Sequence, residues 1–524
     1  MIRVGKADLR GFYRLAYEKV IVQGAAGVYN YSCNKKVFME KKKLNIEMYF
    51  STLKKHSREA LLTFLYIGLS FLFSGTAFLT WYHRLGGYLN GADTGLFFAF
   101  VAYVAQCFGM AVYGIILRRF PEIGKRRVFS GGILILEIMF TALLFIAKDP
   151  GTMVPAGMLL NFSIGLNAGS YLNVLSVNVS KEIRGTVFGL GSGFGSVGSW
   201  IISSMGADNF LLNEKVLIIY SVINTLNLIV VILLGYLKEY ESGTSKNASK
   251  KEEGGRKKYR SVVFAAAVIL LFGVINELSS FYPLANVPDQ SNIIEFSRAF
   301  YAISLVIAGV VNDLNRKFGR MICIVLLVVP FIMLALRDYY NNAFVILLVN
   351  YLVTGFYSVF RAVCFTDYAT DNKELYFLAM GGLFFGRFGE GAGFGIAPFV
   401  RDNMLLLIIV NAALYGLIIL TSMLWVYSDN TGTKSDVSNG RAEDGSEEDE
   451  ELRVKAFAEK YGFSPREVEV LEQILEGSSN GEISEKLFIS GNTVKFHMKN
   501  ILKKTECSNR TELISLVSGS SWQD

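Results

Sequence analysis

Long apolar stretches follow one another along residues 60–427, separated by short polar segments. Each stretch has roughly the length, about 20 residues, that a helix needs to cross the hydrocarbon core of a bilayer. The pattern predicts twelve spans, near residues 60–81, 94–117, 128–147, 152–175, 185–206, 215–237, 261–281, 293–311, 320–337, 342–365, 375–398 and 403–427. A basic polar segment, 238–260, divides them six and six. We therefore expect an all-α membrane bundle with a first half (60–237) and a second half (261–427).

Lys and Arg are unevenly distributed between the polar segments, and their distribution indicates an orientation. With the N-terminus inside, the segments expected in the cytoplasm before the tail carry 32 Lys and Arg, whereas the outer loops carry 5. Positively charged loops stay in the cytoplasm. We expect a multi-pass protein of the cytoplasmic (inner) membrane with both termini cytoplasmic.

The composition argues against a soluble enzyme. Of the 524 residues 52% are apolar and only 19% are charged, and the mean hydropathy is +0.37. The net charge of +7 is distributed unevenly along the chain. Residues 1–59 are basic, with 13 Lys and Arg against 5 acids, and residues 428–524 are acidic, with 12 Lys and Arg against 19 acids. The net charge therefore records membrane orientation rather than affinity for nucleic acid. The five cysteines have no metal-ligand spacing, so neither a disulfide framework nor a zinc site is expected.

The basic segment 1–59 has two interpretations. It is weakly amphipathic and suits a position on the membrane surface. Alternatively Met39 is the true start, and the preceding 38 residues are an upstream mis-start. The first apolar run begins only near Ala60, so no cleavable secretory signal is expected.

The two halves carry related glycine patterns, which we expect to serve close helix packing. Two glycine pairs recur 195 residues apart, Gly114 with Gly124 and Gly309 with Gly319. Three glycines of the fifth span recur 197 residues later in the eleventh, namely Gly185, Gly189 and Gly198, then Gly382, Gly386 and Gly395. Twelve spans in two related halves, with a glycine and basic turn after the second span of each, resemble the major facilitator superfamily over residues 60–427. The resemblance implies the fold but not transport. The superfamily's loop has Gly, Asp and Gly close together, whereas the first copy here lacks Asp and Asp313 in the second is displaced.

Seven ionisable side chains lie at membrane depth, where burying charge is costly: Glu137, Glu277, Glu295, Arg298, Arg361, Arg387 and Glu390. Glu295 with Arg298 and Arg387 with Glu390 are three residues apart, so each pair can neutralise itself on one helix face. The candidate lining of a polar ligand cavity is Glu137, Glu277, Arg361, Arg387 and Glu390. The alternative is structural pairing between helices, or snorkelling to the interface. The sequence has no phosphate-binding loop, catalytic triad or HExxH pattern, so we expect neither an enzyme nor a bound cofactor.

After residue 427 the composition changes abruptly. Residues 428–456 are rich in Gly, Ser, Asn and acids, which predicts a flexible acidic linker. Residues 457–524 then form a separate domain. Apolar residues at helical spacing predict four short helices, beginning near Pro465, Ser479, Asn492 and Asn509, with Ser464 and Glu467 capping the first and Gly477 ending it. A tight turn between the second and third helices predicts a helix-turn-helix module without a wing.

The tail closely resembles the LuxR-type (GerE-like) DNA-binding domain over about 55 residues. The matching residues are Pro465, Arg466, Glu467, Leu471, Gly477, Asn480, Glu482, Ile483, Ile489, Ser490, Thr493, Val494, Lys495, His497 and Ile501. One departure follows the third helix, where the family usually has Leu-Gly and this chain has Thr505 and Glu506. Loss of that Gly removes an easy left-handed helix stop, which leaves the end of the third helix open.

The third helix carries the expected DNA-binding surface. It has Lys495, Lys499, Lys503 and Lys504 and no acid between Asn492 and Thr505, so about four or five phosphate contacts are expected. The resemblance places Lys495, Phe496 and Lys499 at base-reading positions and Thr493 and Lys503 nearer phosphate. It also implies a homodimer paired through the fourth helix, for which Leu513, Leu516 and Val517 are candidates.

These features together predict a membrane-bound one-component LuxR-family transcriptional regulator. Its twelve-helix body would sense a small molecule or the state of the membrane, and promoter DNA would be its partner. The alternative is a secondary transporter of the major facilitator type with a regulatory DNA-binding tail.

Overall fold

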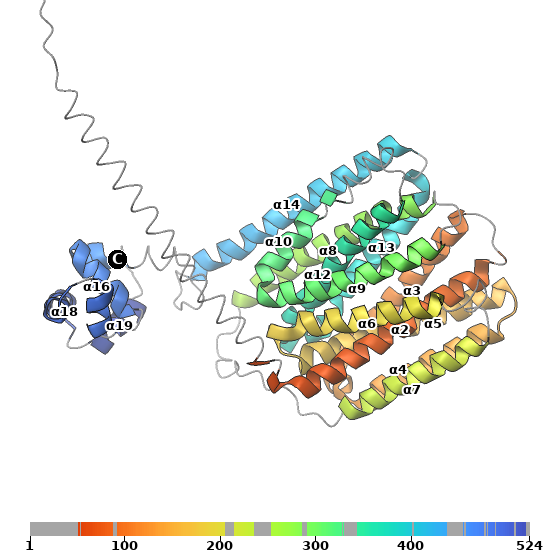
Figure 1. Ribbon diagram of the computed structural model, residues 1–524, viewed down its shortest axis with the longest axis horizontal. Coiled ribbons are helices and arrows are strands. Elements are labelled where there is room, and N and C mark those ends of the chain that lie inside the picture. The colour runs from red at the N-terminus through yellow and green to blue at the C-terminus, as the bar shows by residue number, and fades with distance from the viewer. Residues whose placement is uncertain are drawn as a thin grey trace, which may run out of the picture. The chain divides into compact units, whose positions relative to one another are not determined.

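The computed structural model describes residues 51–519 with interruptions (Figure 1). The residues it leaves out in that range are 53, 87, 89–91, 205–213, 235–252, 286–290, 327, 330–342, 372, 401–402, 437–453, 455–456, 476–477, 479, 488 and 508–509. The chain forms two compact units, Met1–Trp425 and Val426–Asp524. Residues 1–50 of the predicted basic segment 1–59, and the predicted helix stop at Gly477, lie outside the described residues.

Twelve α-helices follow one another before residue 437 in the described part of the chain. They are α2 (Ser57–Gly86), α3 (Ala92–Arg119), α4 (Arg127–Ile146), α5 (Pro150–Asn178), α6 (Arg184–Ser204), α7 (Lys215–Leu234), α8 (Glu253–Ala285), α9 (Ser291–Leu314), α10 (Arg316–Leu326), α12 (Ala343–Asp371), α13 (Gly381–Val400) and α14 (Met404–Asp436). Three short 3-10 helices join them, η1 (Pro121–Lys125), η2 (Lys181–Ile183) and η4 (Lys373–Leu378). Figure 1 shows the long helices running alongside one another as a bundle.

Each predicted span overlaps one of these twelve helices, so the prediction of an all-α membrane bundle is confirmed. Seven of the described helices are long and apolar enough to cross a membrane: α2, α3, α4, α7, α8, α12 and α14. The others include the Gly-rich helices α6 and α13 and the helix α5, which carries several buried Asn and Ser side chains. Of the predicted span 320–337, α10 covers the beginning, and most of the remainder lies outside the described residues.

The two halves pack against each other through a few helix pairs. α6 of the first half packs on α9 of the second, and α3 packs on α13. Within the halves, α2 packs on α6 and α8 on α13. These helices, together with α4, α5 and α12, line the cavity described below.

Close approach of helix backbones explains several of the repeated glycines. A Cβ at Gly185 would lie 2.7 Å from the carbonyl oxygen of Gly309, and one at Gly189 would overlap the carbonyl oxygen of Leu305. At the equivalent place in the second half, a Cβ at Gly382 would overlap the carbonyl oxygen of Arg361. Backbone atoms cannot move aside as flexible side chains can, so the predicted packing role is confirmed at these positions.

In the second unit the structure describes the four helices of the predicted module in the predicted order: α16 (Pro465–Leu475), α17 (Asn480–Lys486), α18 (Gly491–Thr505) and α19 (Arg510–Gly519). Fully buried aliphatic side chains from all four form its core, namely Val470, Leu471, Ile474, Ile483, Val494, Ile501 and Leu513. The core also includes Val454, which lies in the predicted linker 428–456, and Phe457. At the other end of that predicted linker, α14 continues as helix to Asp436.

A reciprocal capping box holds the start of α16, as predicted. The backbone N–H of Ser464 donates to Glu467 Oε2 at 2.8 Å, and the N–H of Glu467 donates to Ser464 Oγ at 3.4 Å. Lys504 Nζ of α18 also donates to Glu467 Oε2, at 2.7 Å. Burial raises the pKa of the Glu467 carboxyl, but the hydrogen bonds from Lys504 and Ser464 outweigh burial and hold the pKa below its usual value. The stabilisation that Glu467 provides is therefore present at neutral pH and lost as the pH falls through that lowered pKa.

The third helix ends in a left-handed turn even though the family's glycine is missing. Glu506 has φ 57° and ψ 22°, and the backbone N–H groups of Glu506 and Cys507 both donate to the carbonyl of Leu502.

We expect Glu506→Gly to stabilise the C-terminal unit by about 1 kcal/mol, because glycine adopts this conformation without the steric cost that a side chain carries. The measurement is amide hydrogen exchange of α18 in the full-length protein. Glu506→Ala is the control, since it removes the charge but keeps the strain, and slower exchange in that variant would contradict the explanation.

Candidate functional site

A cavity of about 420 Å³ lies in the first unit, between the two halves. Helices α2 to α6 line it from the first half, and α8, α9, α12 and α13 line it from the second. The structure brings together at its wall all five predicted cavity residues: Glu137, Glu277, Arg361, Arg387 and Glu390. Their role in binding stays a prediction. The side chains of Glu295 and Arg298, which the sequence suggested as another pair, lie outside the described ones.

Glu390 joins the two cavity arginines. Arg361 Nη1 donates to Glu390 Oε1 at 2.5 Å, and Arg387 Nη1 donates to Glu390 Oε2 at 2.9 Å, which is the pair predicted from their spacing of three. Each guanidinium also lies over an aromatic ring, Arg361 at 4.7 Å from the centroid of Tyr357 and Arg387 at 4.7 Å from that of Tyr103. The Glu390 carboxylate is therefore the shared counter-charge of Arg361 and Arg387.

The other two cavity acids differ from Glu390 in their partners. Glu277 on α8 accepts a long hydrogen bond, 3.5 Å, from Asn276. Glu137 on α4 is 1% exposed, and neither carboxylate oxygen has a hydrogen-bond partner among the described residues. Of the ionisable groups in the cavity wall, Glu137 therefore has the fewest hydrogen-bond partners among the described residues.

Aromatic, amide and hydroxyl side chains form most of the remaining wall. The aromatic rings are Phe71, Phe78, Tyr103, Tyr171, Tyr301, Tyr351 and Phe394, and the amides are Gln106, Asn167, Asn276 and Asn350. These residues could not be predicted from the ionisable groups at membrane depth alone. The signal was present in α5, where Asn161, Asn167 and Asn173 recur every six residues inside an apolar run.

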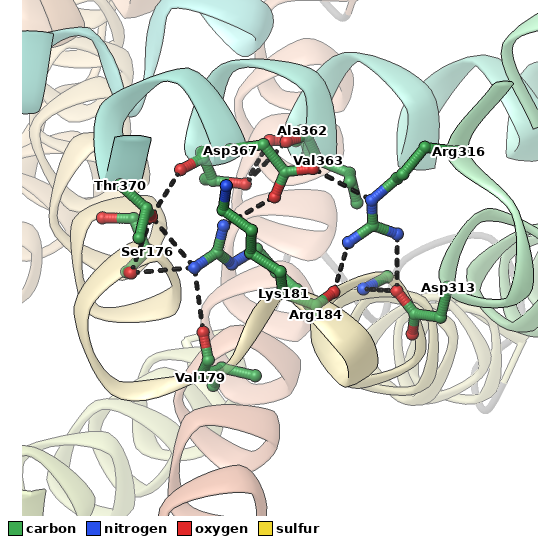
Figure 2. A network of polar contacts seen from close by, with 12 residues as sticks. Ser176, Val179, Lys181, Arg184, Asp313, Arg316, Ala362, Val363, Asp367 and Thr370 are labelled. Atoms are coloured by element: carbon green, nitrogen blue, oxygen red, sulfur yellow. Dashed lines mark hydrogen bonds and ion pairs between the residues drawn. The ribbon is translucent and has the colours of Figure 1, made fainter. Parts of the chain in front are cut away.

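A second polar cluster connects the halves at one end of the bundle (Figure 2). Asp313 of α9 accepts hydrogen bonds from the backbone N–H of Gly185 at 2.7 Å and of Thr186 at 2.6 Å, at the start of α6. Arg316 donates to Asp313 at 2.7 Å and to Asp367 of α12 at 2.9 Å, and its guanidinium also bonds the carbonyl of Lys181. Asp313 thus caps a helix of the opposite half.

Arg184 completes this inter-half cluster from the first half. Its guanidinium donates to Asp367 Oδ1 at 2.6 Å and to the carbonyls of Ser176 and Val179, both at 2.9 Å (Figure 2). Arg184 is 1% exposed, so its positive charge relies on Asp367. Of these residues only Asp313 stands out in the sequence, because it is the acid that is displaced from the superfamily's Gly-Asp-Gly loop. The structure shows that Asp313 is nevertheless placed to bond across the halves.

The helix α18 exposes the predicted DNA-binding side chains of the second unit. Lys495, Lys499 and Lys503 are exposed, and the described contacts include no partner for their ammonium groups. Phe496 is 61% exposed beside them, while Thr493 is half-buried and its hydroxyl bonds Ser490 Oγ at 2.8 Å. These groups lie on the face opposite the buried Val494 and Ile501, as the helical spacing predicted.

Two predictions about this unit need correction. The sequence groups Lys504 with the DNA-binding lysines. In the structure its ammonium donates to Glu467 and to the carbonyl of Gly462, the latter at 2.8 Å, so Lys504 connects α18 to α16. Leu513 was a candidate for the dimer seam, but it is fully buried in the core of the unit. Leu516 and Val517 are only partly buried, and they remain candidates.

Comparison with known families identifies the membrane unit. The model of the Major Facilitator Superfamily matches residues 60–398, more than half of the chain. The chain belongs to the major facilitator superfamily. The crystal structure of the human organic anion transporter MFSD10 has the same fold, with a TM-score of 0.53 at 11% identity over 71% of this chain and 99% of that one.

The tail of this superfamily member matches a second family, the bacterial regulatory proteins of the luxR family, over residues 462–517. The CsgBAC operon transcriptional regulatory protein of Escherichia coli K12 is 50% identical over 50 residues, which are 10% of this chain and 23% of that protein. The transcriptional regulatory protein LiaR of Bacillus subtilis is 53% identical over 50 residues, again 10% of this chain and 24% of that protein. The chain spans about a quarter of the length of these curated relatives, all of it in the tail. Both predicted resemblances are therefore confirmed, and one membrane chain combines a major facilitator domain with a LuxR-type helix-turn-helix domain.

Proposed function

We propose that the chain is a membrane-bound one-component transcriptional regulator, in which the major facilitator unit senses a small molecule and the C-terminal unit binds promoter DNA. The observation that carries the proposal is the presence of both families in one chain, at residues 60–398 and 462–517. The distribution of Lys and Arg supports a cytoplasmic-membrane location with cytoplasmic termini, and this orientation would put the tail on the side of the membrane where DNA is.

The exposed face of α18 supports DNA binding. Lys495 and Lys499 are spaced to reach guanine O6 and N7 acceptors in the major groove, and Lys503 lies one turn further on, toward the phosphate backbone. Phe496, exposed between Lys495 and His497, can contact a thymine methyl group. Pairing of two tails through Leu516 and Val517 would let a homodimer read an inverted repeat.

We expect the double substitution Lys495→Ala/Lys499→Ala to weaken specific DNA binding about a hundredfold or more, because each base contact typically contributes about 1–3 kcal/mol. The slope of log affinity against log salt should change little, because both lysines are placed at bases rather than at phosphates. Sites are first found by genome-wide mapping of DNA bound to the full-length protein, and affinity is then measured with purified protein in nanodiscs.

The matched control is Lys460→Ala/Arg466→Ala, which removes the same charge from exposed positions outside α18. Its affinity should stay within a few fold of the unchanged protein. Equal affinity of the α18 variant and the unchanged protein would refute the DNA-binding half of the proposal.

The charged central cavity also suits a secondary transporter with a regulatory tail, since substrates of such folds bind between the halves. An uptake assay in proteoliposomes separates the two functions. Accumulation that collapses with the ion gradient and with Arg361→Met would favour transport, whereas ligand binding without accumulation would favour a sensor.

A further inference from the structure

The cavity contains one carboxylate whose charge nothing in its wall balances. Arg361 and Arg387 both pair with Glu390, and Glu277 belongs to the same cluster, where its main charged neighbours are Glu390 and Arg387. These four residues are two guanidinium groups and two carboxyl groups that lie together. Glu137 is the fifth ionisable residue of the wall, and it lies on α4 in the other half.

The surroundings of Glu137 provide polarity but no positive charge. Its neighbour Asn167 uses its amide N–H to bond Ser70 Oγ at 3.2 Å, and Asn227 donates to the same oxygen at 3.0 Å. The hydroxyl of Tyr66 lies within bonding distance of Asn167 Oδ1 and Ser170 Oγ. Most donors of this cluster thus bond one another. The Asn167 amide also lies close to Glu137, but no described side chain makes a well-formed hydrogen bond to either oxygen of Glu137, and no cation is among its described neighbours.

A buried carboxylate without a counter-charge is strongly disfavoured, so a site of this kind binds a cation or takes up a proton. The wall beside Glu137 favours an organic cation over a small inorganic ion. Phe71 and Tyr171, whose ring centroids are 5.9 Å apart, line the cavity, and Tyr171 lies between Glu137 on one side and the paired Arg387 and Arg361 on the other. Aromatic faces attract ammonium groups and also cover an apolar body.

We propose that Glu137 is the anchoring residue for the ammonium group of a small organic amine, whose apolar or aromatic body lies against Phe71 and Tyr171 in the central cavity. The proposal deepens the proposed function, since it names the chemical class that the sensor cavity binds. The cavity, at about 420 Å³, has room for a single-ring or short-chain amine.

The test measures thermal stabilisation and calorimetric binding with the full-length protein in nanodiscs at neutral pH. The amine probes are 2-phenylethylamine, benzylamine and hexylamine, and the matched anion and neutral probes are 3-phenylpropionate and 2-phenylethanol. We expect at least one amine to raise the Tm by several degrees, and neither 3-phenylpropionate nor 2-phenylethanol to do so. Glu137→Gln should weaken binding of that amine tenfold or more, whereas Glu122→Gln, an exposed carboxylate outside the cavity, should leave it unchanged.

Three outcomes would overturn the proposal. They are no binding of any of the three amines, stronger binding of 3-phenylpropionate than of 2-phenylethylamine, and amine binding that Glu137→Gln leaves unchanged. If Glu137→Gln does not yield folded protein, Glu137→Asp replaces it, and the shorter carboxylate should weaken amine binding while the anion and the alcohol still fail to bind. A Glu137→Gln protein that is more stable than the unchanged one, without amine binding in either, would identify Glu137 as a proton site and also refute the proposal.

The failure of this inference is distinguishable from the failure of the proposed function. Operator binding measured with and without 2-phenylethylamine tests the regulator, and it does not depend on Glu137. Amine binding that leaves operator binding unchanged would refute sensing but keep the amine site, whereas sequence-specific DNA binding without amine binding would keep the regulator and remove the amine site.

Discussion

Glu390→Gln is expected to destabilise the membrane unit by about 3–5 kcal/mol, because it leaves the buried guanidinium of Arg361 and the partly exposed guanidinium of Arg387 without their shared counter-charge. Glu390 is 3% exposed and bonds Arg361 at 2.5 Å and Arg387 at 2.9 Å, so water cannot replace it easily. The measurement is the midpoint of thermal unfolding in detergent, followed by size-exclusion chromatography, together with the yield of folded protein. A midpoint equal to that of the unchanged protein would show that the three charges are compensated in another way.

A second substitution tests the cause of this loss. In Glu390→Gln/Arg387→Met one of the two uncompensated cations is also removed, so the double variant should be more stable than Glu390→Gln alone. Arg387→Met by itself keeps the Arg361–Glu390 pair and should be the mildest of the three. A double variant less stable than Glu390→Gln would contradict an explanation based on charge.

Asp313→Ala is expected to lower stability by about 3 kcal/mol or more and to loosen the contact between the halves. The Asp313 side chain is fully buried, and it accepts hydrogen bonds from the N–H groups of Gly185 and Thr186 and from Arg316. Its loss leaves buried donors unsatisfied, which costs more than the bonds themselves contribute. The measurements are the thermal midpoint and hydrogen exchange at the start of α6.

Asp149→Ala is the matched control for Asp313→Ala. Asp149 also caps a helix, since it accepts from the N–H of Thr152 at 3.1 Å, but this cap lies within the first half. It should cost only about 1 kcal/mol and leave exchange in α6 unchanged. Equal effects of the two substitutions would mean that Asp313 acts only as a local cap.

Those parts of the molecule that depend on local chemistry could be predicted from the sequence. The capping box of Ser464 and Glu467 follows from residue types three positions apart, and the exposed face of α18 follows from helical spacing. The close packing of Gly189 and Gly382 could be predicted because their positions recur between the halves.

Contacts between distant segments could not be predicted in the same way. Arg184 and Asp367 are 183 residues apart, and only the packing of the halves brings them to 2.6 Å. Lys504 resembled its neighbour Lys503 in sequence, yet Lys504 lies one position further round the helix and reaches Glu467. The five cavity residues could be predicted as a set, since charge is rare at membrane depth, but the isolation of Glu137 from the others depends on the fold.

The cluster of Asp313, Arg316, Asp367 and Arg184 has a consequence for how sensitive a sensor of this design is. A ligand can shift an equilibrium between two arrangements of the halves only by the difference between its affinities for them, and turning a 1:99 population into 99:1 takes about 5.5 kcal/mol. Each hydrogen bond of the cluster that breaks when the halves rearrange raises the free energy of the second arrangement. The difference between the ligand's two affinities must offset that increase. Variants that weaken the cluster should therefore respond at lower ligand concentration but with a higher unliganded background, so the cluster would set the response threshold independently of the cavity.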